Sequence, residues 1–188
     1  MNIKTLPGTT VEVPRSIRSI RTLCSSLFLA GGLTLSQVAS LTNLTPQVLQ
    51  NWVRRGFVPP PVNKKYTQSQ FFRIAIINFL KDNLRIDTIV KLLQYANINT
   101  SDKPVEPLDD AVLYHYFIEA LILADNDIAQ VETAIKSVIK PFQEPYPGAA
   151  KKLAAVIRIM IVLYISSQIK YSAELLLHNI GLEDKEVL

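Results

Sequence analysis

The sequence contains a single cysteine, Cys24, among its 188 residues. One cysteine cannot form an intramolecular disulfide, and it cannot build a zinc site without partners at metal-binding spacing. The two histidines, His115 and His178, lie far apart in the sequence and lack that spacing. We therefore expect no metal site. The lone cysteine also fits a reducing compartment, so we expect a cytoplasmic protein.

A long hydrophobic segment is also missing. The longest apolar run, from Leu153 to Ser166, has about 14 residues and contains Arg158, whereas a bilayer span needs roughly 20. No charged start followed by an apolar stretch and a small-residue cleavage site indicates a signal peptide. The run is therefore interpreted as a buried or interface helix.

Motifs of catalysis are absent as well. The sequence has no glycine-rich phosphate loop and no nucleophile elbow. The paired aspartates, Asp109 with Asp110 and Asp125 with Asp127, fall where helices are expected to start, and capping explains them. We therefore expect no enzymatic activity and no cofactor.

Acidic residues are scarce in the first half of the chain. Residues 1–95 carry 12 Lys and Arg against 3 Asp and Glu, whereas residues 96–188 carry 8 against 13. A basic front half suggests a polyanionic partner, and an acidic rear half suggests a separate role. With 48% apolar and 19% charged residues, the composition is that of a globular protein.

Helix caps and apolar spacing predict a helix-turn-helix that begins at Thr34. Thr34 and Gln37 form a capping box, in which each side chain accepts from the other residue's backbone amide. Thr45 caps a second helix with Pro46 at its first position, and Gly56 ends it. Two short helices joined by about four residues are typical of this motif.

A small wing follows. Pro59, Pro60 and Pro61 hold an extended path, after which the chain is expected to turn back through Asn63 into a two-stranded wing. Thr67 and Gln70 form a second capping box, so a third helix begins directly after Tyr66. A fourth helix is expected from about Ile86 to Tyr95. The pattern predicts a winged helix-turn-helix.

The faces of the second helix separate by polarity. Leu49 and Trp52 are expected in the core, while Gln47, Gln50, Asn51 and Arg54 share the polar face. Such side chains suit base edges and phosphates, although an ordinary solvated face has the same composition. A short helix is also expected from Pro14, and it carries Arg15, Arg18 and Arg21. These arginines are interpreted either as contacts to the phosphate backbone or as an ordinary solvated face.

The segments "LTLSQVASLTNLTPQVLQNWVRRGFVPP" and "YTQSQFFRIAIINFLKDNLRIDTIVKLL" resemble the MerR family of bacterial regulators. Two departures concern the recognition helix, where Gln50-Asn51 replaces the family's Arg-Tyr pair, and the wing, which is shorter. The proline-rich wing and helical tail are more similar to an uncharacterised MerR-like family of Firmicutes, known only as a domain of unknown function.

The resemblance implies an all-α fold with a small β wing and sequence-specific binding of double-stranded DNA by a transcriptional regulator. The expected DNA-binding residues are Thr45, Gln47, Gln50, Asn51, Arg54, Arg55, Lys64, Lys65, Tyr66 and Arg73. The alternative is a protein-interaction module that uses a MerR-like scaffold without binding DNA. An unknown small-molecule effector is left open.

Three parts are expected: a loose arm with a short basic helix over 1–33, the DNA-binding domain over 34–98, and a helical dimerisation or regulatory domain over 104–188. The rear domain is expected to include a helix over about 149–167 and a last helix over about 171–180. The former is apolar all round, so we expect a homodimer. Its predicted interface is Met160, Ile161, Tyr164 and Ile165, with a monomeric bundle as the alternative.

Overall fold

The computed structural model describes residues 3–13, 22, 24–96 and 108–182. It is mostly helical with one small two-stranded sheet, which confirms the expected all-α class with a small β wing. In chain order the named elements are β1 (Leu33–Thr34), α2 (Leu35–Thr42), α3 (Pro46–Arg54), β2 (Lys65–Tyr66), α4 (Gln68–Leu80), α5 (Ile86–Ala96), α6 (Asp110–Ala124), the 3-10 helix η1 (Ile128–Gln130), α7 (Val131–Ile139) and α8 (Ala149–Asn179).

The predicted caps are present in the helix-turn-helix. Thr34 caps α2, and the Gln37 carboxamide oxygen accepts from its backbone amide at 2.8 Å. Asn43 ends α2 in the left-handed conformation, and the Thr45 hydroxyl accepts from the Val48 amide to start α3. These local bonds satisfy the backbone amides that a helix start leaves open, so the helix starts follow from short-range chemistry.

The wing is a minimal hairpin. Val62 and Lys65 exchange two backbone hydrogen bonds of 2.9 Å across Asn63 and Lys64. Both turn residues have positive φ, 48° and 63°, as a type I′ turn requires. The turn through Asn63 was predicted. The paired strand is β1, however, since Leu33 and Thr34 lie opposite Tyr66 and Lys65 in an antiparallel register.

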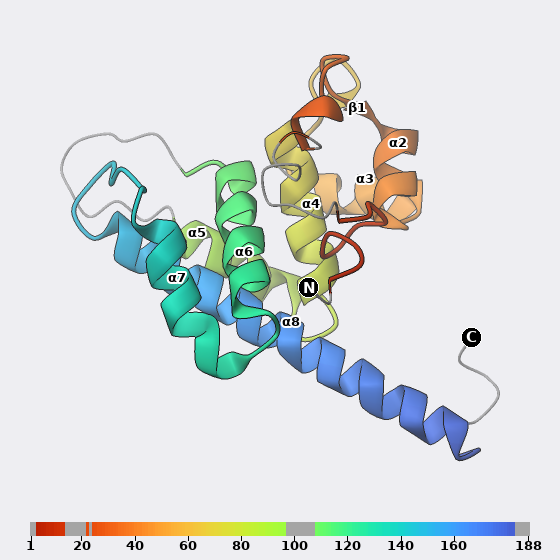
Figure 1. Cartoon of the computed structure of the whole chain (residues 1–188). Coiled ribbons are helices and arrows are strands. Elements are labelled where there is room, and N and C mark those ends of the chain that lie inside the picture. Colours follow the sequence, from red (N-terminus) through yellow and green to blue (C-terminus); the bar gives the residue numbers. More distant parts are fainter. Residues whose placement is uncertain (1–2, 14–21, 23, 97–107, 183–188) are drawn as a thin grey trace.

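The core is organised around α4, which contacts α2, α5, α6 and α8 (Figure 1). Most of its side chains are buried because it has neighbours on several sides. Aromatic rings join it to α6: Phe72 stacks on Tyr114 at 4.5 Å between centroids, and Phe79 stacks on Phe117 at 5.1 Å. One hydrophobic cluster therefore runs from the helix-turn-helix into the rear helices.

The prediction of a loose N-terminal arm is wrong for residues 3–13. Leu6 is fully buried, and the Tyr114 hydroxyl donates to the Pro7 carbonyl at 2.7 Å. Asn78 on α4 donates to the Gly8 carbonyl at 3.0 Å. The polar composition suggested a free tail, but α4 and α6 supply distant partners that the local sequence does not contain. Most of the basic helix expected from Pro14, with Arg15, Arg18 and Arg21, lies outside the described residues.

The predicted break in the last long helix is also wrong. One helix, α8, runs for 31 residues from Ala149 to Asn179. Serines near the expected break do not interrupt it, because the Ser167 hydroxyl donates to the Leu163 carbonyl and the Ser172 hydroxyl to the Gln168 carbonyl. The segment also contains no proline or glycine that would end a helix.

Among the described residues, α8 is a helix that is long and apolar enough to cross a membrane when judged by length and composition. One third of its most apolar stretch, 33%, is buried inside the protein. Core helices of soluble proteins satisfy the same criteria, so this is weak evidence for a membrane span.

The four residues predicted to form a dimer interface do not lie on a free surface. Met160, Ile161 and Ile165 are buried, at 0%, 0% and 4% exposure, and Tyr164 is half-buried with its ring against Phe79. The side of α8 that carries them packs against α4, α5, α6 and α7. These residues belong to the core of the subunit, so the predicted interface is wrong in its residues.

Candidate nucleic-acid interface

Helix α3 has the orientation that the sequence predicts. Leu49 and Trp52 are buried, with exposures of 1% and 4%. Gln47, Gln50 and Arg54 are exposed on the other side. The helix therefore presents amide and guanidinium groups to solvent, while its apolar residues fix it on the core.

Two predicted contact residues already have partners within α3. Asn51 is half-buried, and its side-chain oxygen accepts a 3.1 Å hydrogen bond from Arg54 Nη2. The exposed Thr45 uses its hydroxyl oxygen as the helix cap. Asn51 thus orients the Arg54 guanidinium, a positioning role that the sequence pattern did not reveal.

Cationic groups flank α3 at its end and in the wing. The Arg55 guanidinium lies 4.5 Å from the centroid of the Phe57 ring, and Lys64 is exposed in the hairpin turn. Lys65 donates from Nζ to the Ala30 carbonyl at 2.6 Å. Lys65 therefore holds the wing to the segment before β1. Of the cationic residues predicted to contact DNA, Arg54, Arg55 and Lys64 are exposed.

A surface hollow of about 440 Å³ separates α3 from the wing. Its apolar lining comes from Leu35, Val53, Pro61 and Tyr66, and Gln50, Arg54 and Lys64 complete it. Four of the predicted contact residues, Gln50, Arg54, Lys64 and Tyr66, thus line one hollow, although Arg54 and Lys64 lie ten positions apart in the chain. We call this feature the α3–wing hollow.

Tyr66 was expected to contact DNA, but its exposure is only 3%. It belongs to the hydrophobic core, and burial raises the pKa of its hydroxyl. Its position in β2 opposite Leu33 explains why the ring faces inward. Tyr66 is therefore a structural residue that supports the wing.

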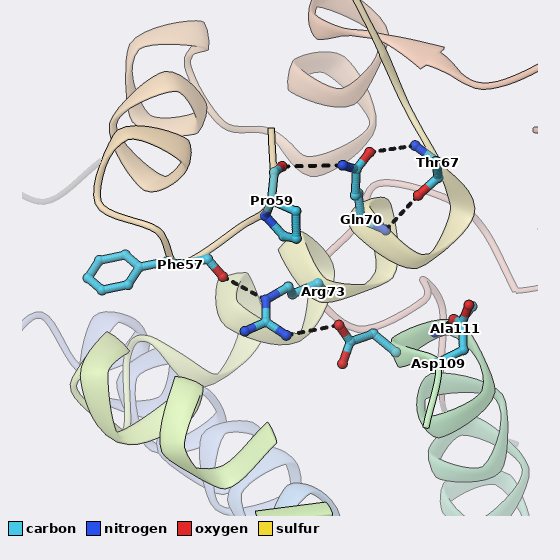
Figure 2. Close-up of polar contacts among 8 residues, drawn as sticks. Phe57, Pro59, Thr67, Gln70, Arg73, Asp109 and Ala111 are labelled. Atoms are coloured by element: carbon cyan, nitrogen blue, oxygen red, sulfur yellow. Dashed lines mark hydrogen bonds and ion pairs between the residues drawn. The ribbon is translucent and has the colours of Figure 1, made fainter. Parts of the chain in front are cut away.

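Arg73 was also expected to contact DNA, and it instead forms an internal network (Figure 2). Its Nε donates to the Phe57 carbonyl at 2.6 Å, and its Nη1 pairs with Asp110 Oδ2 at 3.0 Å. Only 15% of the Arg73 side chain is exposed. The guanidinium is thus committed to the fold, and Arg73 is not available to a phosphate.

Gln70 also contacts the proline segment, in addition to its part in the capping box. Figure 2 shows its carboxamide between the start of α4 and the proline segment. Its oxygen accepts from the Thr67 amide at 2.8 Å, while its nitrogen donates to the carbonyls of Pro59 and Pro60 at 3.3 and 2.7 Å. The prolines keep the segment extended, and Gln70 anchors it.

Charge in this region has one sign over a long stretch of sequence. No Asp or Glu occurs between Glu12 and Asp82, whereas nine Lys and Arg do. The α3–wing hollow lies in the acid-free stretch, so no carboxylate near it in sequence opposes an approaching phosphate.

Among the described residues, no group of three or more His, Cys, Asp or Glu side chains is arranged to hold a metal ion. Cys24 is buried, and burial raises the pKa of its thiol to about 11. Its thiol therefore stays protonated at neutral pH and lacks the character of a reactive cysteine.

Comparison with known proteins gives one match. The chain matches no curated protein and no solved structure. Residues 29–117 match the family model described as a domain of unknown function, DUF1836. This stretch is less than half of the chain, and it reaches from just before β1 into α6, so it includes both Arg73 and Asp110.

Proposed function

We propose that this protein is a MerR-like transcriptional regulator that binds double-stranded DNA through α3 and the wing. The observation that carries the proposal is the α3–wing hollow, where Gln50, Arg54 and Lys64 converge from two separate elements. In this proposal the protein acts in the cytoplasm, needs no cofactor and catalyses no reaction.

In the proposed complex, α3 enters the major groove. Gln47 and Gln50 are exposed and carry both amide donors and acceptors, which suit the edge of adenine. Arg54 is aimed by Asn51 and reaches a guanine or a phosphate. Arg55 and Lys64 lie at the margins and neutralise phosphates, which fix the register without reading the sequence.

The test is a titration of labelled duplex DNA at several salt concentrations. The probe is the DNA upstream of the protein's own gene, and a random duplex of equal length measures non-specific binding. The triple variant Arg54→Gln, Arg55→Gln, Lys64→Gln should bind more weakly. Its slope of log affinity against log salt should be smaller by roughly 2.7, because each phosphate contact contributes about 0.9.

The matched control removes three exposed lysines of the rear half: Lys136→Gln, Lys140→Gln, Lys151→Gln. It changes net charge equally, so it should retain the wild-type slope if α3 and the wing form the contact. A wild-type affinity that barely responds to salt would contradict the proposal. Equal losses of DNA affinity in both triple variants would mean that net charge alone attracts the DNA, without a specific contact at α3 and the wing.

A second candidate function is a protein-interaction module without DNA binding. The apolar lining of the α3–wing hollow favours it, since Leu35, Val53 and Pro61 suit an aliphatic side chain of a peptide. Binding of that kind depends little on salt, and Val53→Asp should abolish it. Measurable DNA binding that the Arg54, Arg55 and Lys64 variant removes would exclude this alternative as the main function.

A further inference from the structure

The Phe57 ring supports one of the cations at the end of α3. The Arg55 guanidinium lies 4.5 Å from the centroid of this ring, which is within the range of a cation–π contact. Arg55 is exposed, whereas Phe57 is buried in the hydrophobic core, with 7% exposure. The core therefore holds the ring, and the ring in turn contacts the exposed guanidinium.

Two hydrogen bonds fix the backbone of Phe57. Its amide donates to the Trp52 carbonyl at 2.9 Å, in the Schellman motif that ends α3. Its carbonyl accepts from Arg73 Nε at 2.6 Å. The first bond is local, but the second comes from α4, 16 positions further along the chain. Arg73 thus joins the end of α3 to α4 at the residue that carries the ring.

Asp110 holds another nitrogen of the same guanidinium. Its Oδ2 lies 3.0 Å from Arg73 Nη1, and Figure 2 shows the Arg73 side chain between Phe57 and the start of α6. The planar fork of arginine serves both partners at once, with Nε on Phe57 and Nη1 on Asp110. Because Asp110 is the first residue of α6, a rear helix fixes the direction of the Arg73 guanidinium.

We propose that Arg73 is a positioning residue for DNA binding, which through Phe57 holds the Arg55 guanidinium ready for a phosphate. This inference rests on the proposed function, in which Arg55 neutralises a phosphate beside α3. A long side chain that is already ordered loses little conformational freedom on binding, so its contact is stronger than that of a mobile arginine. Arg73 contributes to affinity in this way although its own guanidinium does not reach the DNA.

Lys64 provides the internal comparison. It is exposed like Arg55, but it lies in a turn that is closed by two backbone hydrogen bonds between Val62 and Lys65. Neither of these bonds involves Arg73. The chain therefore offers two cations of the same proposed interface, of which one is held through Arg73 and the other is held within the wing.

A cycle of DNA-binding measurements tests the positioning role. The perturbing variant combines Arg73→Met with Asp110→Asn, which keeps net charge unchanged and leaves no buried carboxylate unpaired. It should weaken binding to the duplex from upstream of the gene about fivefold, the factor expected when one long side chain must be ordered on binding. The same loss is expected in a Lys64→Gln background. In an Arg55→Gln background the double change should have no further effect.

Asp110→Asn alone is the matched control. An asparagine oxygen accepts the same hydrogen bond from Arg73 Nη1, so the guanidinium keeps its direction and its bond to the Phe57 carbonyl. This variant should retain the wild-type affinity. Circular dichroism and urea denaturation establish that each variant is folded at the temperature of the titration.

Phe57→Leu is a second perturbing variant, because it removes the ring but keeps the backbone bonds and a buried apolar side chain. It should give the same pattern in the wild-type, Lys64→Gln and Arg55→Gln backgrounds. Its result is informative even if the double variant does not fold, since the Arg73–Asp110 pair is intact in it.

Nuclear magnetic resonance of the free chain tests the contact without DNA. The Arg55 Nε–Hε signal is assigned by its loss in Arg55→Gln, and in the wild type the ring current of Phe57 should shift it and its motion should be restricted. In the Arg73→Met, Asp110→Asn variant both properties should approach those of Arg85, which is also exposed. The signal of Arg85 itself should not change.

Three outcomes would overturn the positioning role: no loss of affinity in the perturbing variants, an equal loss in all three backgrounds, or an Arg55 signal that is the same in the wild type and the double variant. An equal loss is what a merely structural role of Arg73 would give. A wild type that does not bind DNA rejects the proposed function as well, whereas DNA binding without coupling between Arg73 and Arg55 rejects the positioning role alone.

Discussion

Arg73 on α4 and Asp110 at the start of α6 form a partly buried ion pair of 3.0 Å, with side-chain exposures of 15% and 12%. The same guanidinium donates to the Phe57 carbonyl directly after α3 (Figure 2). One side chain thus connects the segment that ends α3 to the rear helices. The family match over 29–117 includes both residues, which agrees with a folding unit that extends past the predicted boundary near residue 98.

Replacing Arg73 with methionine should destabilise the protein by about 3 kcal/mol at neutral pH, because it leaves the Asp110 carboxylate buried without its counter-charge. Burial raises the pKa of Asp110 above its ordinary 3.8, against the opposing effect of Arg73. The folded state therefore holds this proton more tightly than the unfolded state. The stability from this group is complete below pH 3.8 and is lost as the pH rises through the folded-state pKa.

Without Arg73 that pKa rises further, so the difference in unfolding free energy between wild type and Arg73→Met should grow from pH 3.5 to 7. Urea denaturation at several pH values measures it. Arg85→Met, at an exposed arginine, is the control and should cost little at any pH. A penalty for Arg73→Met that does not depend on pH would mean that packing, not charge, gives Arg73 its importance.

Lys64→Gly should make the fold more stable and the DNA complex weaker. Lys64 has φ of 63° in the type I′ turn, a conformation that costs a non-glycine residue about 1 kcal/mol. Glycine removes that cost, so thermal unfolding should shift upward by several degrees. Loss of the charge should reduce the salt slope by about 0.9 if Lys64 contacts a phosphate. Unchanged affinity for DNA would remove Lys64 from the interface.

Trp52→Ala should destabilise the chain by about 3–5 kcal/mol, as expected for the loss of a large buried aromatic side chain. Trp52 is 4% exposed in the core beneath α3. Gln50→Ala on the exposed side of the same helix is the control and should change the free energy of unfolding by no more than about 0.5 kcal/mol. Similar values for the two variants in guanidinium denaturation would show that α3 is rotated relative to this structure.

Gly8→Ala should cost about 3 kcal/mol through a steric clash and an unfavourable backbone conformation. Gly8 has φ of 76°, and an added Cβ would lie 2.0 Å from the Ala75 carbonyl oxygen of α4. Gly31 has nearly the same φ, 77°, but its nearest such atom is 4.0 Å away. Gly31→Ala should therefore show the conformational cost alone, about 1 kcal/mol. Equal costs would mean that the N-terminal segment does not pack closely on α4.

The sequence by itself determined the features that depend on neighbours in the chain. The Thr34–Gln37 and Thr67–Gln70 boxes, the turn at Asn63 and the inward face of α3 all involve residues a few positions apart. Their hydrogen bonds and apolar spacing are encoded locally, so the sequence predicts them. The same local patterns predicted α5 and a cap of α6 at Asp109 or Asp110, of which Asp109 is the cap in the structure.

Only the tertiary structure decided which polar residues are buried and which apolar residues are exposed to solvent. Tyr66 and Arg73 resemble DNA contacts in sequence, but β1 and Asp110, which are distant in the chain, hold them inside. In α8 the sequence shows an apolar helix without saying which side is covered. Packing against α4, α5, α6 and α7 buries Met160 and Ile161, whereas α8 extends beyond these helices from Gln168 onward and leaves Ile169 and Leu176 exposed. The physical reason is that composition and periodicity determine how much apolar surface a helix must bury. The position and direction of each helix relative to its neighbours determine which residues are buried and which elements bury them.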